Sequence, residues 1–434
     1  MGKETVNERA GLLKKYIEIR ELTEVICLPL EIEDYVIQPI VDVSPPKWHL
    51  GHTTWFFETL LLQRYSPTYR PYHSLFSFLF NSYYESLGTQ VERSRRGHLS
   101  RPTVKETYIY RSSIDRQMHD VIEDIAEEHW SDFSGLVALG LQHEQQHQEL
   151  LLTDIKFILA GNPLRPVYRR GADPTISVET ADPLPSEIGY VTVPAGMYEI
   201  GFRGEGFCYD NEQPVHHVYV KDFLLRDCLV TNAEYLKFMA DGGYRNFRYW
   251  LSDGWELVQK EGWGAPLYWL KIDGVWCEFT LSGLRPMVQE APVCHVSCFE
   301  ADAFAKWAGK RLPTEVEWEV AAYFSGAQAT EGNFLDNAAH HPVPLGNQRT
   351  KNAQLSQMFG DVWEWTASAY LPYPGYRAAE GALGEYNGKF MMNQMVLRGG
   401  SCVTPRDHIR ISYRNYFQPE KRWQFTGIRL ADDT

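Results

Sequence analysis

The 434-residue chain has 44% hydrophobic and 23% charged residues, a composition typical of a globular protein, and its length predicts two or three domains. Its net charge of −14 at pH 7 argues against a general affinity for nucleic acid, which requires a basic surface. No apolar run approaches the roughly 20 residues of a membrane-spanning helix, and the charged N-terminus lacks the apolar core of a signal peptide.

The N-terminal part of the chain has the periodicity of long helices. Apolar residues recur at helical spacing, with charged residues between them, over 7–27, 49–65, 111–130 and 132–162. The last segment ends in a Gly-Asn-Pro sequence, which is a common helix stop. Four long helices with polar connections predict a bundle with a site between facing helices.

The composition and the periodicity of the sequence then change. Residues 169–189 contain prolines and acidic residues and are interpreted as an interdomain linker. Residues 190–202 predict a strand pair, and short segments rich in Gly, Trp and Tyr follow, with one clear helix over 297–312. The sequence therefore predicts a helical domain (1–168), a linker (169–189) and a loop-rich domain with short strands (190–434). The seven cysteines are scattered and odd in number, which indicates no disulfide framework and favours the cytoplasm.

Residues 143–147 read His-Glu-Gln-Gln-His, the H-E-x-x-H signature of zinc metalloproteases. On a helix, His143 and His147 lie on one face about one turn apart, so they suit two ligands of one metal ion. The metzincin continuation is absent, whereas a distant glutamate ligand is not excluded by the spacing.

Two further histidines, His49 and His52, lie at the start of another predicted helix. Three neutral imidazoles from two helices suit a divalent first-row metal that keeps positions open for substrate and O₂. These ligands do not by themselves name the metal, because the usual affinity order favours zinc over Fe(II).

Three strings of the helical half, WHLGHTTWFFE, HEQQHQEL and RRGHLSRPTV, resemble the iron-binding DinB-type bundle of sulfoxide synthases. The C-terminal half resembles the formylglycine-generating-enzyme (sulfatase-modifying factor) domain in strings such as DNEQPVHHVYV, FGDVWEWTAS and VLRGGSC. The two domains in this order resemble the EgtB-type sulfoxide synthases of ergothioneine biosynthesis. The resemblance implies an α + (α+β) fold class, with a DinB-like four-helix bundle followed by a loop-rich, C-type-lectin-like domain.

That family joins the sulfur of cysteine or γ-glutamylcysteine to the imidazole C2 of Nα-trimethylhistidine (hercynine) and oxidises the sulfur to a sulfoxide. The resemblance implies Fe(II) as cofactor, O₂ as co-substrate, and His52, His143 and His147 as the iron ligands. Glu144 points about 100° around the helix from His143, so it is not expected to act as a protease base. His49 is expected to pack, or to hydrogen-bond a ligand, rather than to bind the metal.

Several residues are expected to bind the substrates. Arg93 and Arg96 match the family's R-x-x-R and are expected to bind the thiol's carboxylate, because guanidinium forks bind carboxylates bidentately. Gln146 matches a glutamine that hydrogen-bonds the histidine-derived substrate. Tyr83 and Tyr84 are candidates for a catalytic phenol that delivers a proton or hydrogen atom and steers the product away from simple thiol dioxygenation. Which of the two tyrosines acts stays open.

The trimethylammonium group of hercynine favours aromatic faces. Near the C-terminus the sequence YRNYFQPEKRWQF offers such faces, and we expect Asn415, Tyr416 and Phe417 to contact this substrate.

Other functions are less well supported. An ovothiol-type synthase, which joins cysteine and histidine at another imidazole carbon, is disfavoured because no methyltransferase domain follows before Thr434. Formylglycine generation is disfavoured because only Cys402 follows the R-G-G-S motif, where that activity needs a cysteine pair. A zinc peptidase and a non-catalytic lectin-like binding module are the remaining alternatives. The sulfur donor stays open, with a slight preference for cysteine, and so does the oligomeric state.

Overall fold

The protein is described by a computed structural model that covers residues 3–82, 84–169, 189–345, 355–378 and 387–434. The described residues up to Tyr168 form one compact unit, and those from Arg169 onward form a second. The predicted linker 169–189 lies outside the described residues except for its two end positions. Within the described ranges, no helix combines the length and the apolar character that crossing a membrane requires.

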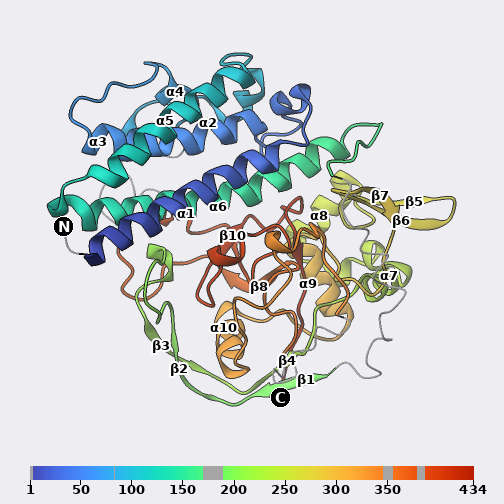
Figure 1. The fold of residues 1–434 in the computed structure, drawn as a ribbon. Coiled ribbons are helices and arrows are strands. Elements are labelled where there is room, and N and C mark those ends of the chain that lie inside the picture. The colour runs from blue at the N-terminus through green and yellow to red at the C-terminus, as the bar shows by residue number, and fades with distance from the viewer. Residues whose placement is uncertain (1–2, 83, 170–188, 346–354, 379–386) are drawn as a thin grey trace. The chain divides into compact units, whose positions relative to one another are not determined.

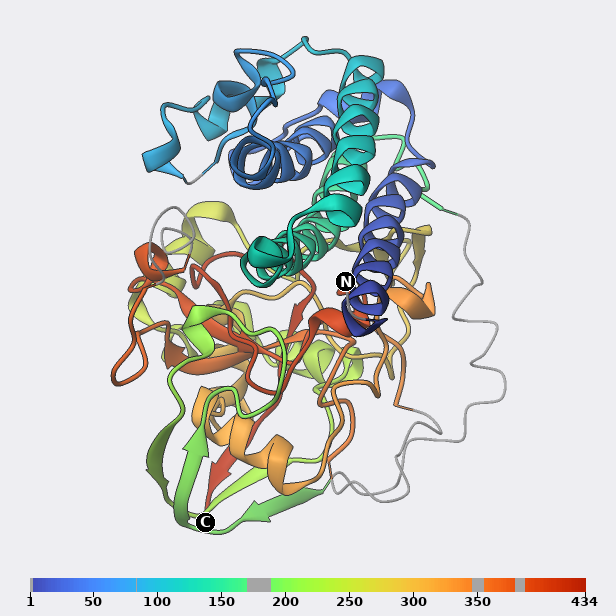
Figure 2. The same cartoon turned by 60° about the vertical axis from the view of Figure 1, so that its left-hand side comes forward.

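The first unit is a helical bundle, as predicted. Its long helices are α1 (Lys3–Cys27), α2 (Pro46–Phe57), α5 (Val104–Asp124) and α6 (Glu127–Ala160). Shorter helices and turns are η1 (Ile32–Val36), α3 (Gln63–Tyr65), α4 (Phe76–Phe80), η3 (Glu85–Leu87) and η4 (Arg93–His98). A π-helical turn, η2 (Glu58–Leu62), carries α2 on into α3. Helix α6 packs against α1 and α2, and α2 packs against α5 (Figures 1 and 2).

The core of the first unit is rich in aromatic side chains. Tyr16 of α1, Trp55 and Phe57 of α2, and Tyr110 of α5 are all fully buried. Burying each such side chain contributes roughly 1.5–3 kcal/mol. This packing fixes which faces of α2 and α6 turn inward, so polar residues on those faces are enclosed together.

The ends of two bundle helices differ from the prediction. Helix α5 begins before the predicted range 111–130 because Thr103 caps it: the Thr103 hydroxyl accepts the Glu106 N–H at 3.2 Å, and the Glu106 carboxylate accepts the Thr103 N–H at 2.7 Å. Non-helical backbone at Ile125 and Ala126 then separates α5 from α6, which is earlier than the predicted break.

The described residues of the second unit form four small sheets. The first sheet has the order β1 (Tyr190–Val193), β4 (Phe223–Arg226) and β12 (Ala431–Asp433), with β4 central, and the second has the order β10 (Asn415–Phe417), β9 (Met395–Arg398), β8 (Trp363–Ala369) and β11 (Thr426–Gly427). The third sheet pairs β2 (Gly196–Ile200) with β3 (His216–Val220). The fourth has the order β5 (Trp269–Ile272), β6 (Val275–Thr280) and β7 (Gly283–Pro286). All pairings are antiparallel except that of β11 with β8. Its described α-helices are α7 (Asn232–Ala240), α8 (Ser252–Glu261), α9 (Cys298–Trp307) and α10 (Glu315–Phe324), and short 3-10 turns lie between the elements. This mixed, loop-rich unit completes the predicted α + (α+β) fold class.

The predicted strand pair over 190–202 is wrong in its pairing. Both strands exist, but Tyr190 of β1 lies opposite Arg226 of β4, and Gly196 of β2 lies opposite Val220 of β3. The connection between β1 and β2 is Pro-Ala, which lacks the Asn-Gly or Asp-Gly chemistry of a tight hairpin. The chain therefore passes from one sheet to the next instead of reversing.

The second unit is also more helical than predicted, since 297–312 is not its one clear helix. Helix α7 begins with a capping box between Thr231 and Glu234, and α10 begins with one between Thr314 and Glu317. These helices are nine and ten residues long, too short for their periodicity to stand out from the surrounding aromatic segments.

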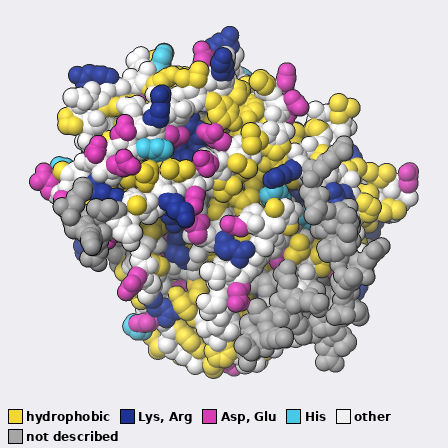
Figure 3. Space-filling model, viewed as in Figure 1, with side chains coloured by type: hydrophobic (Ala, Val, Ile, Leu, Met, Phe, Trp, Pro, Cys, Tyr) yellow, Lys and Arg dark blue, Asp and Glu magenta, His cyan; other side chains and the backbone are white. Residues whose placement is uncertain are grey.

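Charged side chains of both signs are interspersed on the face of the molecule shown in Figure 3. Among the described residues visible there, Lys and Arg form no continuous basic patch. This distribution accompanies the net charge of −14.

Candidate metal centre

Three histidines of the first unit come together inside the bundle. His52 lies on α2, and His143 and His147 lie on successive turns of α6. One ring nitrogen from each lies within 4.8 Å of the others, and the Nε2 atoms of His52 and His143 are 3.2 Å apart. The three side chains are buried. The two histidines four residues apart on α6 and the one on α2 therefore form a single cluster.

The His52 ring is held from several sides. Its Nδ1 donates to the carbonyl oxygen of Phe80 at 2.6 Å, and its ring stacks on Trp48 and on Trp55, with ring centroids 4.6 and 5.6 Å away. Gly51 makes the contact with Phe80 possible, because a Cβ at this position would overlap the Phe80 ring. With Nδ1 occupied, the Nε2 lone pair of His52 faces the cluster.

The electrostatics of the cluster favour neutral rings. Burial lowers the pKa of His52 and of His147 well below the usual value, and it lowers the pKa of His143 to about 4. The three imidazoles are therefore uncharged at pH 7 and carry lone pairs. Nitrogen ligands held about 2.1 Å from one ion lie roughly 3 Å apart when they are adjacent, which matches the separation of His52 and His143. The residues present fit a first-row divalent metal ion.

Glu144, the central residue of the H-E-x-x-H sequence, does not face this cluster. Its Oε1 accepts from Arg111 at 2.6 Å and from Thr23 at 2.7 Å, and its Oε2 accepts from Arg20 at 2.7 Å. Burial raises the pKa of the Glu144 carboxyl, but the two guanidinium groups more than offset it and bring the value to about 2. The carboxylate is thus an internal counter-ion between three helices, and the peptidase reading of the motif is wrong.

His49 lies one turn before His52 on α2 and is not part of the cluster of ligand atoms. Its Nδ1 lies 2.9 Å from Nδ1 of His147, and its Nε2 lies 3.1 Å from Oδ2 of Asp154. His49 thus contacts His147, which remains a candidate ligand, and the role expected for His49 beside the metal stays a prediction.

The two predicted arginines have different surroundings. Arg96 is buried, stacks over Trp48 with its Cζ 3.4 Å from the ring centroid, and donates to the hydroxyls of Ser44 and Ser82, each at 3.0 Å. Since Trp48 also stacks on His52, Arg96 lies next to the histidine cluster. Arg93 is half-buried and donates to the carbonyl groups of residues 41 and 42 at 3.1 and 2.6 Å.

The other predicted residues of the first unit are placed unevenly. Tyr84 is 3% exposed, and its ring lies against Trp55 and Phe56 in the wall of the cluster. Gln146 is half-buried and directly precedes His147 on α6. Tyr83 lies outside the described residues.

The predicted residues of the second unit form strand β10. Tyr416 stacks on Tyr370 with ring centroids 4.0 Å apart, and its hydroxyl donates to the Asn387 side chain at 3.2 Å. Phe417 makes an edge contact with Trp423, and Asn415 accepts from the Tyr416 N–H.

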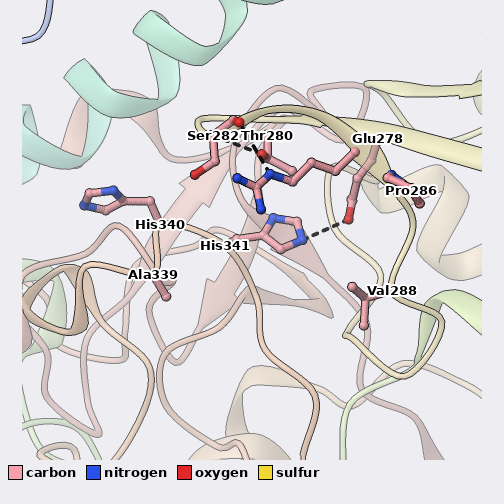
Figure 4. A pocket seen from close by; sticks show the side chains of 9 residues that line it. Glu278, Thr280, Ser282, Pro286, Val288, Ala339, His340 and His341 are labelled. Carbon is pink, nitrogen blue, oxygen red and sulfur yellow. Dashed lines mark hydrogen bonds and ion pairs between the residues drawn. The ribbon is translucent and has the colours of Figure 1, made fainter. Parts of the chain in front are cut away.

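A second group of titratable side chains lies in a hollow of the second unit, between β6, β7 and residues 339–341 (Figure 4). Nε2 of His341 is 2.9 Å from Oε1 of Glu278, and both side chains are buried. His340 points away from His341 (Figure 4). The hollow offers about 10 Å³, room for one water molecule, so it is too small for an organic substrate.

Sequence reasoning missed three buried partners near the cluster: Arg20 and Arg111, which bind Glu144, and Asp154, which contacts His49. Arg20, Arg111 and Asp154 are far from their partners in sequence, and nothing local to them marks the contact. One usable feature was their charge, since ionised residues on the apolar faces of predicted helices need buried partners.

Comparisons with known proteins agree with this architecture. Residues 16–151 match the DinB superfamily, and residues 177–434 match the sulfatase-modifying factor enzyme 1-like domain. The fold and the histidine cluster thus define a protein that joins a DinB-type bundle to a sulfatase-modifying-factor domain.

The chain is 31% identical to the hercynine oxygenase of Mycolicibacterium thermoresistibile, over 99% of this chain and 96% of that protein. It is 31% identical to the hercynine oxygenase of Mycolicibacterium smegmatis, over 90% and 91% of the two chains. A formylglycine-generating enzyme of Streptomyces coelicolor is 30% identical, over 56% of this chain and 89% of that enzyme. The chain belongs to the hercynine oxygenase family, and it is therefore an enzyme.

Proposed function

We propose that this enzyme is a non-haem iron(II), O₂-dependent sulfoxide synthase that acts on hercynine and a cysteine-type thiol. In this reaction the imidazole C2–H of hercynine and the S–H of the thiol are lost, a C–S bond forms, and one oxygen atom of O₂ enters the product as a sulfoxide. The other oxygen atom leaves as water together with the two hydrogens. The observation that carries the proposal is the cluster of three buried, neutral histidines in a chain that is related over its whole length to hercynine oxygenases.

In this proposal His52, His143 and His147 hold the metal through their ring nitrogens. Iron bound there supplies the redox chemistry toward O₂ and favours the thiolate form of the sulfur donor. Three neutral ligands leave the positive charge of the ion uncompensated, which helps to retain an anionic sulfur. Bringing both substrates and O₂ together at this site would turn an encounter of three reactants into a local reaction.

We assign the carboxylate of the thiol substrate to Arg96 and Arg93. Arg96 supports this role because it is buried beside Trp48 and close to the histidine cluster, where a guanidinium group offers a planar fork of donors. The serine hydroxyls that it contacts hold its orientation before substrate binds. Both cysteine and γ-glutamylcysteine carry a suitable carboxylate, and cysteine is the preferred donor.

Gln146 is assigned to the imidazole of hercynine, since it precedes His147 and is accessible enough to meet a ligand. Tyr84 is the phenol assigned to proton or hydrogen-atom delivery, with Tyr83 as its alternative. The buried ring of Tyr84 supports this choice, because its contact with Trp55 places a phenol beside the histidine cluster.

In the second unit, Asn415, Tyr416 and Phe417 remain our assignment for the trimethylammonium group. The proposed domain limits are 1–168, 169–189 and 190–434. The proposed compartment is the cytoplasm, which the seven free thiols support.

The test is a single-turnover experiment with purified protein. The enzyme is loaded anaerobically with Fe(II), mixed with hercynine and either cysteine or γ-glutamylcysteine, and exposed to ¹⁸O₂. The expected product is the hercynine–thiol sulfoxide with one ¹⁸O atom, detected by mass spectrometry, and the faster thiol identifies the donor. A His143→Ala variant should form none. Stoichiometric iron binding without coupling of either thiol would contradict the proposed substrates, and histidine would then be the next acceptor to test.

A further inference from the structure

A continuous hydrogen-bonded chain runs from the histidine cluster to a buried carboxylate. It passes from His147 through both ring nitrogens of His49 to Asp154, with steps of 2.9 and 3.1 Å. His49 is 2% exposed and Asp154 is 3% exposed, so solvent does not compete for these contacts. The chain ends at Oδ2 of Asp154, which also accepts the backbone N–H of Ser44 at 2.8 Å.

The direction of the hydrogen bonds follows from this end. Oδ2 of Asp154 already accepts a backbone N–H, so it is also an acceptor toward His49, and Nε2–H of His49 is the donor. An imidazole that gives its one N–H at Nε2 presents a lone pair at Nδ1. The short Nδ1–Nδ1 contact therefore requires His147 to donate from its own Nδ1. The lone pair of His147 is left on Nε2.

We infer that His49 and Asp154 are positioning residues that fix His147 in the tautomer and ring orientation needed to bind the metal through Nε2. The inference depends on the metal site of the proposed function and extends it to residues beyond the ligands. Carboxylates and carbonyl groups commonly orient metal-binding histidines in this way. Here a second histidine stands between the carboxylate and the ligand, and it spans from α2 to α6.

The same orientation is reached by another route at His52, where the Phe80 carbonyl accepts the Nδ1–H directly. His52 and His147 thus both donate their Nδ1–H and present Nε2 to the centre. For His52 the acceptor is a backbone carbonyl, and for His147 it is the His49 side chain, which is bonded in turn to Asp154. This agreement supports a common requirement at the centre and not an accidental contact at His49.

The test compares two substitutions of His49, one that keeps the contact with His147 and one that keeps the contact with Asp154. An asparagine side chain places its polar end near the Nδ1 position, whereas a glutamine side chain places it near the Nε2 position. His49→Asn therefore retains an acceptor for His147, and His49→Gln retains only the contact with Asp154. The probe is Co(II), titrated into the full-length, metal-free protein and followed by its visible absorption bands.

We expect His49→Gln to weaken Co(II) binding about 10- to 100-fold, the usual cost of losing an orienting partner, and His49→Asn to stay within about threefold of the wild type. Thr153→Val is the matched control: Thr153 is next to Asp154 on α6, is also buried, and its hydroxyl donates to the carbonyl of Glu149 in its own helix. It should leave Co(II) affinity unchanged. Equal affinity in both His49 variants, whether high or low, would overturn the inference.

A measurement on the wild type keeps the inference testable if a variant fails to fold. In ¹⁵N-histidine-labelled, metal-free protein, the His147 ring, assigned by comparison with His147→Gln, should carry its proton on Nδ1. A proton on Nε2 would overturn the inference. Failure of the proposed function has a different signature, since the wild type would then bind no Co(II) at the three histidines or couple no thiol, whatever the tautomer of His147.

Discussion

Glu144 and Arg111 form an ion pair in which neither side chain has any solvent exposure and Oε1 lies 2.6 Å from Nη2. A second guanidinium, from Arg20, binds Oε2 at 2.7 Å. Glu144 follows the candidate ligand His143 directly, yet its carboxylate connects α6 to α1 and α5. The inward face of α6 holds the histidines, and a neighbouring face holds the charge that joins the helices.

We expect Glu144→Gln to destabilise the folded protein by about 3–5 kcal/mol, because it removes the buried carboxylate shared by two guanidinium groups, which then keep only Asp115 and Glu24 as counter-charges. Urea unfolding followed by circular dichroism measures the loss. Glu128→Gln, at an exposed position on the first turn of α6, is the control and should change stability by less than about 0.5 kcal/mol. A Glu144→Gln protein of normal stability that lost only catalysis would contradict the structural role.

The same carboxylate predicts a dependence of stability on pH. The pKa of Glu144 is about 2 in the folded protein and has an ordinary value of 4.5 when exposed. Its stabilising contribution is therefore complete above pH 4.5 and is lost as the pH falls toward 2, and it corresponds to about 3 kcal/mol. The difference in unfolding free energy between wild type and Glu144→Gln should shrink over that range. Titration of the other groups is common to both proteins and cancels in the difference.

Gly51 should tolerate no side chain. We expect Gly51→Ala to cost about 1–3 kcal/mol, because the new Cβ overlaps the Phe80 ring, and to weaken metal binding, because the Phe80 carbonyl moves away from His52. Gly135→Ala is the matched control on α6. Its Cβ would meet nothing within 4 Å, so a gain of roughly 0.5–1 kcal/mol is expected from helix propensity. Thermal unfolding and Co(II) titration of both variants check the pair.

Arg96→Lys tests the proposed carboxylate site. Lysine keeps the charge but loses the planar fork, so the KM for the thiol should rise at least about tenfold, while the KM for hercynine changes little. Arg95→Lys, at an exposed position on the same turn, should change neither value. An Arg96→Lys enzyme with an unaltered KM for the thiol would exclude the assignment.

The sequence predicted those parts of the site that depend on spacing within one helix. His143 and His147 share a face because they are four residues apart, and that relation survives any arrangement of neighbours. The link between His49 and Asp154 joins residues 105 positions apart, and it depends on the register in which α2 packs against α6. Side-chain packing sets that register, and no local pattern records it.

The same distinction explains the errors in the fold. Strands β1 and β2 were expected to pair because neighbours in sequence usually do, but each pairs with a strand that arrives later in the chain. The start of α5 could have been read from Thr103 and Glu106, whose spacing is that of a capping box. Tertiary partners were hidden from the sequence, whereas this local capping feature was present in it.

The ion pairs around Glu144 join three helices without passing through any of the histidines. The scaffold that brings His52 near His143 is thus stabilised by the protein's own charges and aromatic packing. We therefore expect the bundle to fold before the metal binds, so that a metal ion that dissociates or is oxidised can be replaced in the folded protein. For an oxygenase, such replacement of the metal ion requires no new synthesis of the protein.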